Sequence, residues 1–333
     1  MGKERRNQQV RTDQQDGFVL LILFRVSAAL GLHDAELCGL THLEPLLRHG
    51  TPEPPPLASG PLFSAATAVE WANVIQSEAA MSETLFRSGQ AQQCTSLSAY
   101  VWLEGIGTLI SKDRRNGRLD ETAVNSYHDY LVSSYTRYSE PTAKEQHGLL
   151  SLTMLWHWVY MCLLVDFDQL ERAIGRDGPE AAEVAIGYVL EWVSSPNSTR
   201  CALHAFLAQQ QLQGLPFGSV PAIHVPRILF SAAVSWYCYL QYGPAENVVM
   251  NVIENLGVHF PEFGILSQPA DKQLSEITLL SWKRGNVSDL KAITLCQLGD
   301  SLQQIKHWGI AKEFAKIVAC LIYHNPQDSI WDQ

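Results

Sequence analysis

The sequence predicts an all-α protein, and three observations support this fold class. Apolar residues recur at steps of three and four along the chain, whereas alternation of period two is almost absent. Helix-opening signals such as Ser-Pro and Gly-Pro-Glu precede several of these patterns. Apolar residues make up 46% and charged residues 17% of the chain, which indicates a large core and excludes a disordered or collagen-like protein. We therefore expect a bundle of about ten helices around a central apolar helix near residues 149–174.

The N-terminal part of the chain combines a polar tail with two expected helices. Residues 1–17 are polar and locally basic, and apolar patterns predict helices over Phe18–Leu32 and near Asp34–His49. Five prolines between positions 52 and 61 cannot continue a helix and favour an extended spacer. This proline-rich segment is the clearest internal boundary in the sequence.

The proline-rich segment is compatible with two domain organisations. In the first, residues 1–61 hold the basic tail, the first helices and the spacer, and residues 62–333 form a helical domain. In the second, the segment is a surface loop within one continuous domain over residues 18–325. Both organisations stay open at this point.

The most apolar part of the chain is expected at the centre of the bundle. Residues from Met154 to Val165 are apolar on nearly all sides of a helix, which is typical of a helix surrounded by other helices. Gly175 follows as a left-handed helix stop. In this half of the chain, helices are expected at Ser64–Phe86, Thr95–Ser111, Glu121–Tyr138 and Glu145–Ile174.

The later helices are marked by their first residues. Pro179 and Pro226 stand at first helical positions, where no backbone N–H is needed, and Ser195 precedes Pro196 as an N-cap. Ser288 is the expected cap of a further helix. The expected helices run over 179–193, 195–212, 226–243, 288–302 and 310–324, with shorter pieces between residues 244 and 286.

The cysteines and the N-terminal histidines do not indicate a metal site. The seven cysteines are odd in number and widely spaced, without a Cys-x-x-Cys pair, so we expect buried, reduced thiols and no zinc finger. His33, His42 and His49 are separated by nine and seven residues, too far for a ligand pair on one helix. The cysteines are Cys38, Cys94, Cys162, Cys201, Cys238, Cys296 and Cys320.

Charge and hydropathy argue against two classes of protein. The 24 basic and 34 acidic side chains give a net charge of −10, so we do not expect the chain to bind nucleic acid by itself. The long apolar run Leu149–Val165 is shorter than the about 20 residues that a membrane-spanning helix needs, and it contains polar residues such as His157. We therefore expect a buried core helix and no membrane association.

No motif that carries catalysis occurs in the sequence. Glycine-rich phosphate loops, a Gly-x-Ser-x-Gly elbow and a His-Glu-x-x-His pair are absent. A terpene-type cyclase is a helical enzyme of similar size, but Asp166 and Asp168 would point to nearly opposite helix faces and could not easily share a magnesium ion. We expect these acids, with Glu171 and Arg172, to mark where the central helix meets solvent. The sequence predicts no catalytic, cofactor-binding or metal-binding residue.

Two histidines and a set of aromatic residues lie within apolar helical patterns. His157 and His204 are expected to be hydrogen-bonded core residues rather than ligands or catalytic groups. The aromatic residues could either pack in the core, which is the commoner outcome, or line a small-molecule pocket. They are Trp156, Trp158, Tyr160, Trp192, Trp236, Tyr237 and Tyr239.

Over about residues 145–325 the chain resembles a known helical family. It is similar to the C-terminal portion of the fungal-specific transcription factor regulatory domain, as found in regulators with two-Cys two-His zinc fingers. The resemblance is thinner over residues 18–140. It rests on Leu155-Trp156-His157, Met161, Leu164, Asp166, Asp168, Leu170-Glu171, Gly175-Arg176-Asp177-Gly178, Trp192, Ser195-Pro196, Arg200-Cys201-Ala202-Leu203-His204-Ala205, Pro221-Ala222-Ile223-His224-Val225-Pro226 and Ile305-Lys306-His307-Trp308-Gly309-Ile310-Ala311.

The resemblance implies a regulatory domain without enzymatic activity. Such a domain would act in the nucleus on RNA polymerase II transcription, through contacts with the transcription machinery or regulator proteins, and a homodimer is compatible with it. Zinc and DNA binding would reside in a separate module, which these residues do not contain. Relatives tend to carry a more basic run where this chain has Asn197-Ser198-Thr199-Arg200. The alternative is a helical enzyme or an effector-binding domain with an aromatic-lined pocket.

Overall fold

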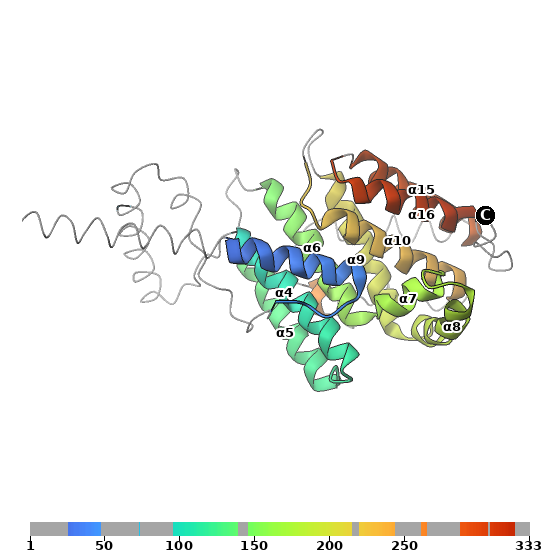
Figure 1. Ribbon diagram of the computed structural model, residues 1–333, viewed down its shortest axis with the longest axis horizontal. Coiled ribbons are helices and arrows are strands. Elements are labelled where there is room, and N and C mark those ends of the chain that lie inside the picture. The colour runs from blue at the N-terminus through green and yellow to red at the C-terminus, as the bar shows by residue number, and fades with distance from the viewer. Residues whose placement is uncertain are drawn as a thin grey trace, which may run out of the picture. The chain divides into compact units, whose positions relative to one another are not determined.

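The structure is a computed structural model whose regular elements, in the described residues, are all α-helices without a strand (Figure 1). The predicted all-α fold class is therefore confirmed. The structure describes residues 26–47, 73, 96–138, 146–214, 220–243, 261–264, 287–305 and 307–323.

The chain divides into two compact units. One comprises Met1–Thr108 with Arg137–Glu140, and the other comprises Leu109–Thr136 with Pro141–Gln333. The proline-rich boundary between positions 52 and 61 lies outside the described residues, as does nearly all of the helix expected at Ser64–Phe86. The predicted organisation into residues 1–61 and 62–333 therefore stays a prediction.

The first described helix, over residues 26–41, corrects the predicted pair of N-terminal helices. It runs without interruption through Gly31 and through the expected break at His33. Asp34 does not begin a new helix. Its carboxylate accepts hydrogen bonds from the backbone N–H groups of Leu46 and Leu47 at 3.0 and 2.9 Å. The helix ends at His42, which has a positive φ of 54°.

The later helices begin at or close to the predicted residues. Pro179 and Pro196 occupy first helical positions, and Pro226 follows one residue after the start of its helix. The helices are α4 (Ser96–Arg115), α5 (Glu121–Tyr138), α6 (Gln146–Leu164), α7 (Phe167–Ala173), α8 (Pro179–Val193), α9 (Pro196–Gln213), α10 (Val225–Tyr242), α13 (Pro261–Gly264), α15 (Val287–Gln304) and α16 (Gly309–Tyr323).

The core of the larger unit is built on α6 and α10. Helix α6 packs against α9 and α10, and α10 also packs against α15 and α16 (Figure 1). Every residue from Met154 to Val165 is at most 5% exposed, as predicted for a helix surrounded by others. The aromatic residues singled out in the sequence are all buried, which favours core packing over a pocket lining.

The predicted central helix is broken at Val165–Asp166. Helices α6 and α7 meet at an angle of 79°, so the expected single helix over Glu145–Ile174 is wrong at this point. Asp166 is the N-cap of α7, where its carboxylate accepts from the N–H of Asp168 at 3.1 Å. Its own N–H donates to the hydroxyl of Tyr188 at 2.8 Å. Asp166 therefore marks both the start of α7 and the end of the helical backbone of α6 before it.

A search of the described residues for membrane spans finds no single helix that is long and apolar enough to cross a bilayer. Only together would the bent pair of helices Leu150–Leu164 and Phe167–Ala173 be long and apolar enough for a membrane span, judged by length and composition alone.

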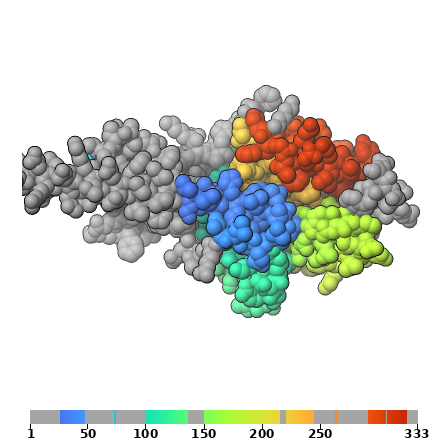
Figure 2. Space-filling model, in the orientation of Figure 1, coloured from blue at the N-terminus to red at the C-terminus, as the bar shows by residue number. Residues whose placement is uncertain are grey.

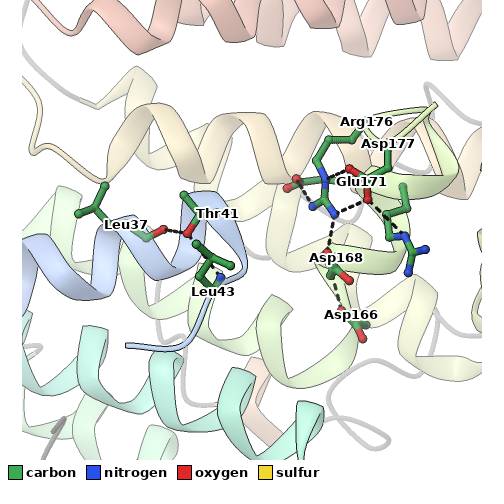
Figure 3. A network of polar contacts seen from close by, with 9 residues as sticks. Leu37, Thr41, Leu43, Asp166, Asp168, Glu171, Arg176 and Asp177 are labelled. Carbon is green, nitrogen blue, oxygen red and sulfur yellow. Dashed lines mark hydrogen bonds and ion pairs between the residues drawn. The ribbon is translucent and has the colours of Figure 1, made fainter. Parts of the chain in front are cut away.

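The turn between α7 and α8 depends on two glycines and an ion cluster. The N–H groups of Gly175 and Arg176 donate to the carbonyls of Arg172 and Glu171, which is a Schellman motif, and Gly175 has the predicted positive φ, at 103°. The Arg176 guanidinium contacts Asp168 at 2.6 Å, Asp177 at 3.0 Å and Glu171 at 3.3 Å (Figure 3). Asp168, Glu171 and Asp177 therefore organise the end of α7 through Arg176, and Glu171 is buried there, whereas the sequence predicted that these acids meet solvent.

Three of the six cysteines that the structure describes are buried. Cys162, Cys201 and Cys238 lie in the core, as expected, whereas Cys296 and Cys320 are exposed, which corrects the prediction for these two. Both lie on the outer faces of amphipathic helices, where a small apolar residue needs no burial. Cys94 lies outside the described residues.

Gly178 should be intolerant of substitution. Its φ of 92° and ψ of 173° fall in a region that is essentially restricted to glycine, so we expect Gly178→Ala to lower the free energy of unfolding by about 1–3 kcal/mol. The matched control is Gly187→Ala in the exposed interior of α8, which should raise it by about 0.5–1 kcal/mol. Urea unfolding of both variants measures the difference, and equal effects would contradict the assignment.

Candidate functional site

A cluster of titratable side chains lies in the interior of the larger unit. It joins α5, α6, α9 and the short helix α13, and we call it the buried ionic centre. Arg200 is 16% exposed at its side chain, whereas His157, His204 and Glu262 are at most 1% exposed. The members of the centre are His128, His157, Tyr160, Arg200, His204 and Glu262.

Two histidines from packed helices form the inner end of the centre. The Nδ1 atoms of His157 on α6 and His204 on α9 are 2.9 Å apart, so one ring donates and the other accepts. The Nε2 atom of His204 faces Glu262 Oε1 at 3.7 Å. A proton on this Nε2 is favoured by the nearby carboxylate, so we assign the Nδ1 proton to His157, which donates to His204.

Glu262 and Arg200 form the charged part of the centre. Arg200 Nε donates to Glu262 Oε1, while Oε2 of the same carboxylate is buried and accepts no hydrogen bond within the described part of the chain. Arg200 and His204 stand four residues apart on α9, so both point from one helix face toward the carboxylate. A buried acceptor without a partner costs about 1–3 kcal/mol, so the fit of this carboxylate is incomplete.

The outer end of the centre is formed by His128 and Tyr160. His128 Nδ1 lies 3.2 Å from the hydroxyl of Tyr160 and 3.4 Å from Arg200 Nη2. The Arg200 guanidinium can only donate, so this nitrogen accepts and the imidazole is neutral. The Tyr160 ring stacks on the His204 ring with centroids 4.6 Å apart and planes 7° apart. The histidines are therefore fixed by ring packing as well as by hydrogen bonds.

The ionisation of the centre follows from burial and from the single ion pair. Burial lowers the pKa of His157 well below its ordinary value, and the neighbouring His204 lowers it further. Burial also lowers the pKa of His204, against the opposing effect of Glu262. Burial alone would raise the pKa of Glu262, but the interactions of the carboxylate with His204 and Arg200 outweigh this effect and set the pKa to about 2. At neutral pH the centre holds one carboxylate, one guanidinium and neutral rings.

The arrangement can hold a carboxylate, and the described residues show no metal-binding group. A guanidinium and an imidazole N–H converge on one anionic oxygen, which is the chemistry of carboxylate recognition. Within the described ranges, no group of three His, Cys, Asp or Glu side chains is placed to hold a metal ion.

The structure places the histidines and acids singled out in the sequence in different surroundings. It brings His157 and His204 into direct contact and buries both, as predicted. Asp166 and Asp168 lie instead at the start of α7, joined by a capping hydrogen bond. His33 is exposed in the smaller unit.

Sequence reasoning missed Glu262, Arg200 and His128. A usable signal was present for two of them. Arg200 and His204 have the spacing of one helix face, and Glu262 is a single acid within an apolar and aromatic stretch. The pairing itself joins residues 62 positions apart, which no local pattern reveals.

A second feature of the larger unit is a groove of about 520 Å³ at α15 and α16. It is lined by apolar residues, among them Leu302, Ile305 and Trp308, and by the exposed Lys312 and Lys316. The indole N–H of Trp308 donates to the carbonyl of Pro221 at 2.9 Å, which fixes this ring. In Figure 2, α15 and α16 form a continuous stretch of surface (red).

Comparison of the chain with protein-family models, with curated proteins and with solved structures finds no match. The resemblance to the fungal regulatory domain therefore stays a prediction.

Glu262 should stabilise the fold in a pH-dependent manner. Its pKa is lowered from 4.5 to about 2 on folding, so its stabilisation is complete above about pH 4.5 and is lost as the pH falls toward 2. The shift corresponds to a loss on the order of 3 kcal/mol. Urea unfolding of the native protein and of Glu262→Gln should therefore show a stability gap at neutral pH that closes toward pH 2. The exposed Glu183→Gln is the control, and a gap independent of pH would refute the assignment.

The two central histidines should stay neutral in mildly acidic solution. Because burial lowers the pKa of both rings, we expect the Cε1–H signals of His157 and His204 to stay constant between about pH 8 and about pH 6 in NMR spectra. A titration of either signal centred at the ordinary histidine value would contradict the neutral pair.

Proposed function

We propose that this chain is a non-catalytic helical regulatory domain, of the kind found in fungal zinc-finger transcription factors, that controls RNA polymerase II transcription in the nucleus through protein contacts. The observation that carries the proposal is the packing of the interior. The imidazole and aromatic side chains that would have to line an active-site pocket lie against one another in the core.

The packing around Trp156 illustrates this support. Its indole N–H donates to the carbonyl of Leu131 at 2.8 Å, and its ring contacts those of Tyr135, Tyr160 and His204. These contacts use both the apolar and the polar parts of the side chain. An aromatic-lined pocket is therefore a weaker interpretation of these residues than a structural core.

The α15–α16 groove supports a role in protein contacts. Apolar side chains bordered by Lys312 suit an acidic, amphipathic segment of a partner protein, because this lysine complements its charge. Lys316, also at the groove, is paired with Glu313 at 2.8 Å. The chain as a whole carries a net charge of −10, which disfavours direct contact with nucleic-acid phosphates. The resemblance over about residues 145–325 agrees with such a regulatory role.

A tethering experiment tests the proposal. The full chain is fused to an unrelated DNA-binding module and directed to a reporter promoter in fungal cells, and transcript levels are compared with those for the module alone. We expect a change in transcription, and we expect the double variant Lys312→Glu and Lys316→Glu to remove most of it because the reversed charges repel an acidic partner.

Arg115→Glu provides the control, since it reverses another exposed cation outside the groove. Circular dichroism verifies that each variant is folded. A fusion that leaves transcription unchanged would contradict the proposal, as would turnover of a substrate that is abolished by a change at His157 in a protein that stays folded.

A further inference from the structure

The carboxylate of the buried ionic centre comes from a segment that contributes two described side chains. Helix α13 spans Pro261–Gly264, and its Glu262 is fully buried against Arg200 and His204. The ring of Phe263 lies over that of His204, with centroids 4.8 Å apart and planes at 34°. Together these side chains present an anion and an adjoining phenyl ring to the helical core.

The groups that receive this carboxylate belong to long, packed helices. Arg200 and His204 lie on α9, which packs along α6 and α10, and Tyr160 on α6 stacks on His204. Cys201 and Ala205, which lie between and beside these residues on α9, are fully buried. The helices that carry the guanidinium and the imidazole are therefore held in place by elements other than α13, so both groups would stay near the site without Glu262.

Glu262 fits this site incompletely. Its Oε1 takes the Arg200 hydrogen bond, but His204 Nε2 is 3.7 Å away, beyond hydrogen-bond length, and has no other partner among the described residues. The second oxygen, Oε2, is buried without a donor. A free carboxylate is not constrained by a peptide backbone and can place both oxygens against these donors.

We propose that the Arg200–His204 site binds a small aromatic carboxylate, and that Glu262 and Phe263 occupy it as an internal substitute that such a ligand displaces. The guanidinium would hold the ligand carboxylate, and the His204 ring would contact the ligand ring as it now contacts Phe263. Arg200 and His128 are only partly buried, so the centre has a side that approaches solvent. This inference goes beyond the proposed function, because it assigns a ligand whether or not the domain regulates transcription.

If a ligand competes with Glu262 for the site, its apparent affinity depends on how often Glu262 leaves the site. The apparent affinity for a ligand falls in proportion to the fraction of molecules in which the site is open. Removing the charge of Glu262 should raise that fraction, whereas removing Arg200 should abolish binding. The two changes therefore act in opposite directions on the same site.

Isothermal titration calorimetry with phenylacetate tests this competition. We expect Glu262→Gln to bind phenylacetate about tenfold or more tightly than the native chain, because the competing carboxylate is lost. The double variant Glu262→Gln with Arg200→Gln should not bind it, and Glu183→Gln should behave as the native chain. The neutral phenylacetamide should not bind any of these proteins. Equal affinity of the native chain and Glu262→Gln would overturn the proposal, as would equal binding of the amide.

A second variant and a measurement on the native chain keep the proposal testable if Glu262→Gln does not fold. Phe263→Ala keeps the ion pair but removes the ring contact with His204, so it should bind phenylacetate more tightly than the native chain. In the native chain, saturating phenylacetate should shift the NMR signals of the Phe263 ring as it leaves the His204 ring. Unchanged Phe263 signals together with unchanged affinity in Phe263→Ala would refute displacement.

Discussion

Burial of α6 on all sides is the constraint on which the larger unit depends. A helix with no polar face can be accommodated only if other helices surround it, and α9 and α10 supply much of that surrounding surface. The polar atoms that α6 brings inside must also find partners. The indole nitrogen of Trp158 donates to Ser231 at 3.2 Å, and the Arg227 guanidinium lies over its ring at 3.6 Å. Packing and polar pairing are therefore satisfied by the same neighbouring helices.

The charged side chains of the buried ionic centre also need partners inside the core. A carboxylate and a guanidinium inside a helical core have to be paired, because the desolvation of either alone would oppose folding strongly. Neutral imidazoles and a tyrosine hydroxyl complete the pairing without adding net charge. The centre therefore links α5, α6 and α9 to α13.

The helical fold could be predicted largely from local patterns. Proline at first helical positions located the starts of α8 and α9, and the all-round apolar character of residues 154–165 identified the core helix. The break before α7 was missed because Asp166 serves as an N-cap within a stretch that is otherwise continuously helical in pattern. The N-terminal break was wrongly predicted, since the helix over residues 26–41 continues through His33.

The candidate site was only half predictable. Burial of His157 and His204 followed from their apolar neighbours, but their partners depend on long-range packing that brings α13 to α9. A charged residue within an apolar stretch indicates that a counter-charge is needed without indicating where in the sequence it lies. For this reason Glu262 could have been identified as unusual, whereas Arg200 could not have been identified as its partner.

The cysteines of the larger unit differ in reactivity, because some of their thiols are buried and others are exposed. Burial raises the pKa of Cys201 to about 12 and raises that of Cys238 as well, so these thiols resist alkylation at neutral pH. Cys320 lies on the exposed side of α16, next to Ala319 of the groove. Within the larger unit, a maleimide fluorophore would therefore attach at the exposed Cys296 and Cys320 in preference to the core thiols, and Cys296→Ser would confine it to Cys320. Its emission would report on occupancy of the groove while the interior stays unmodified.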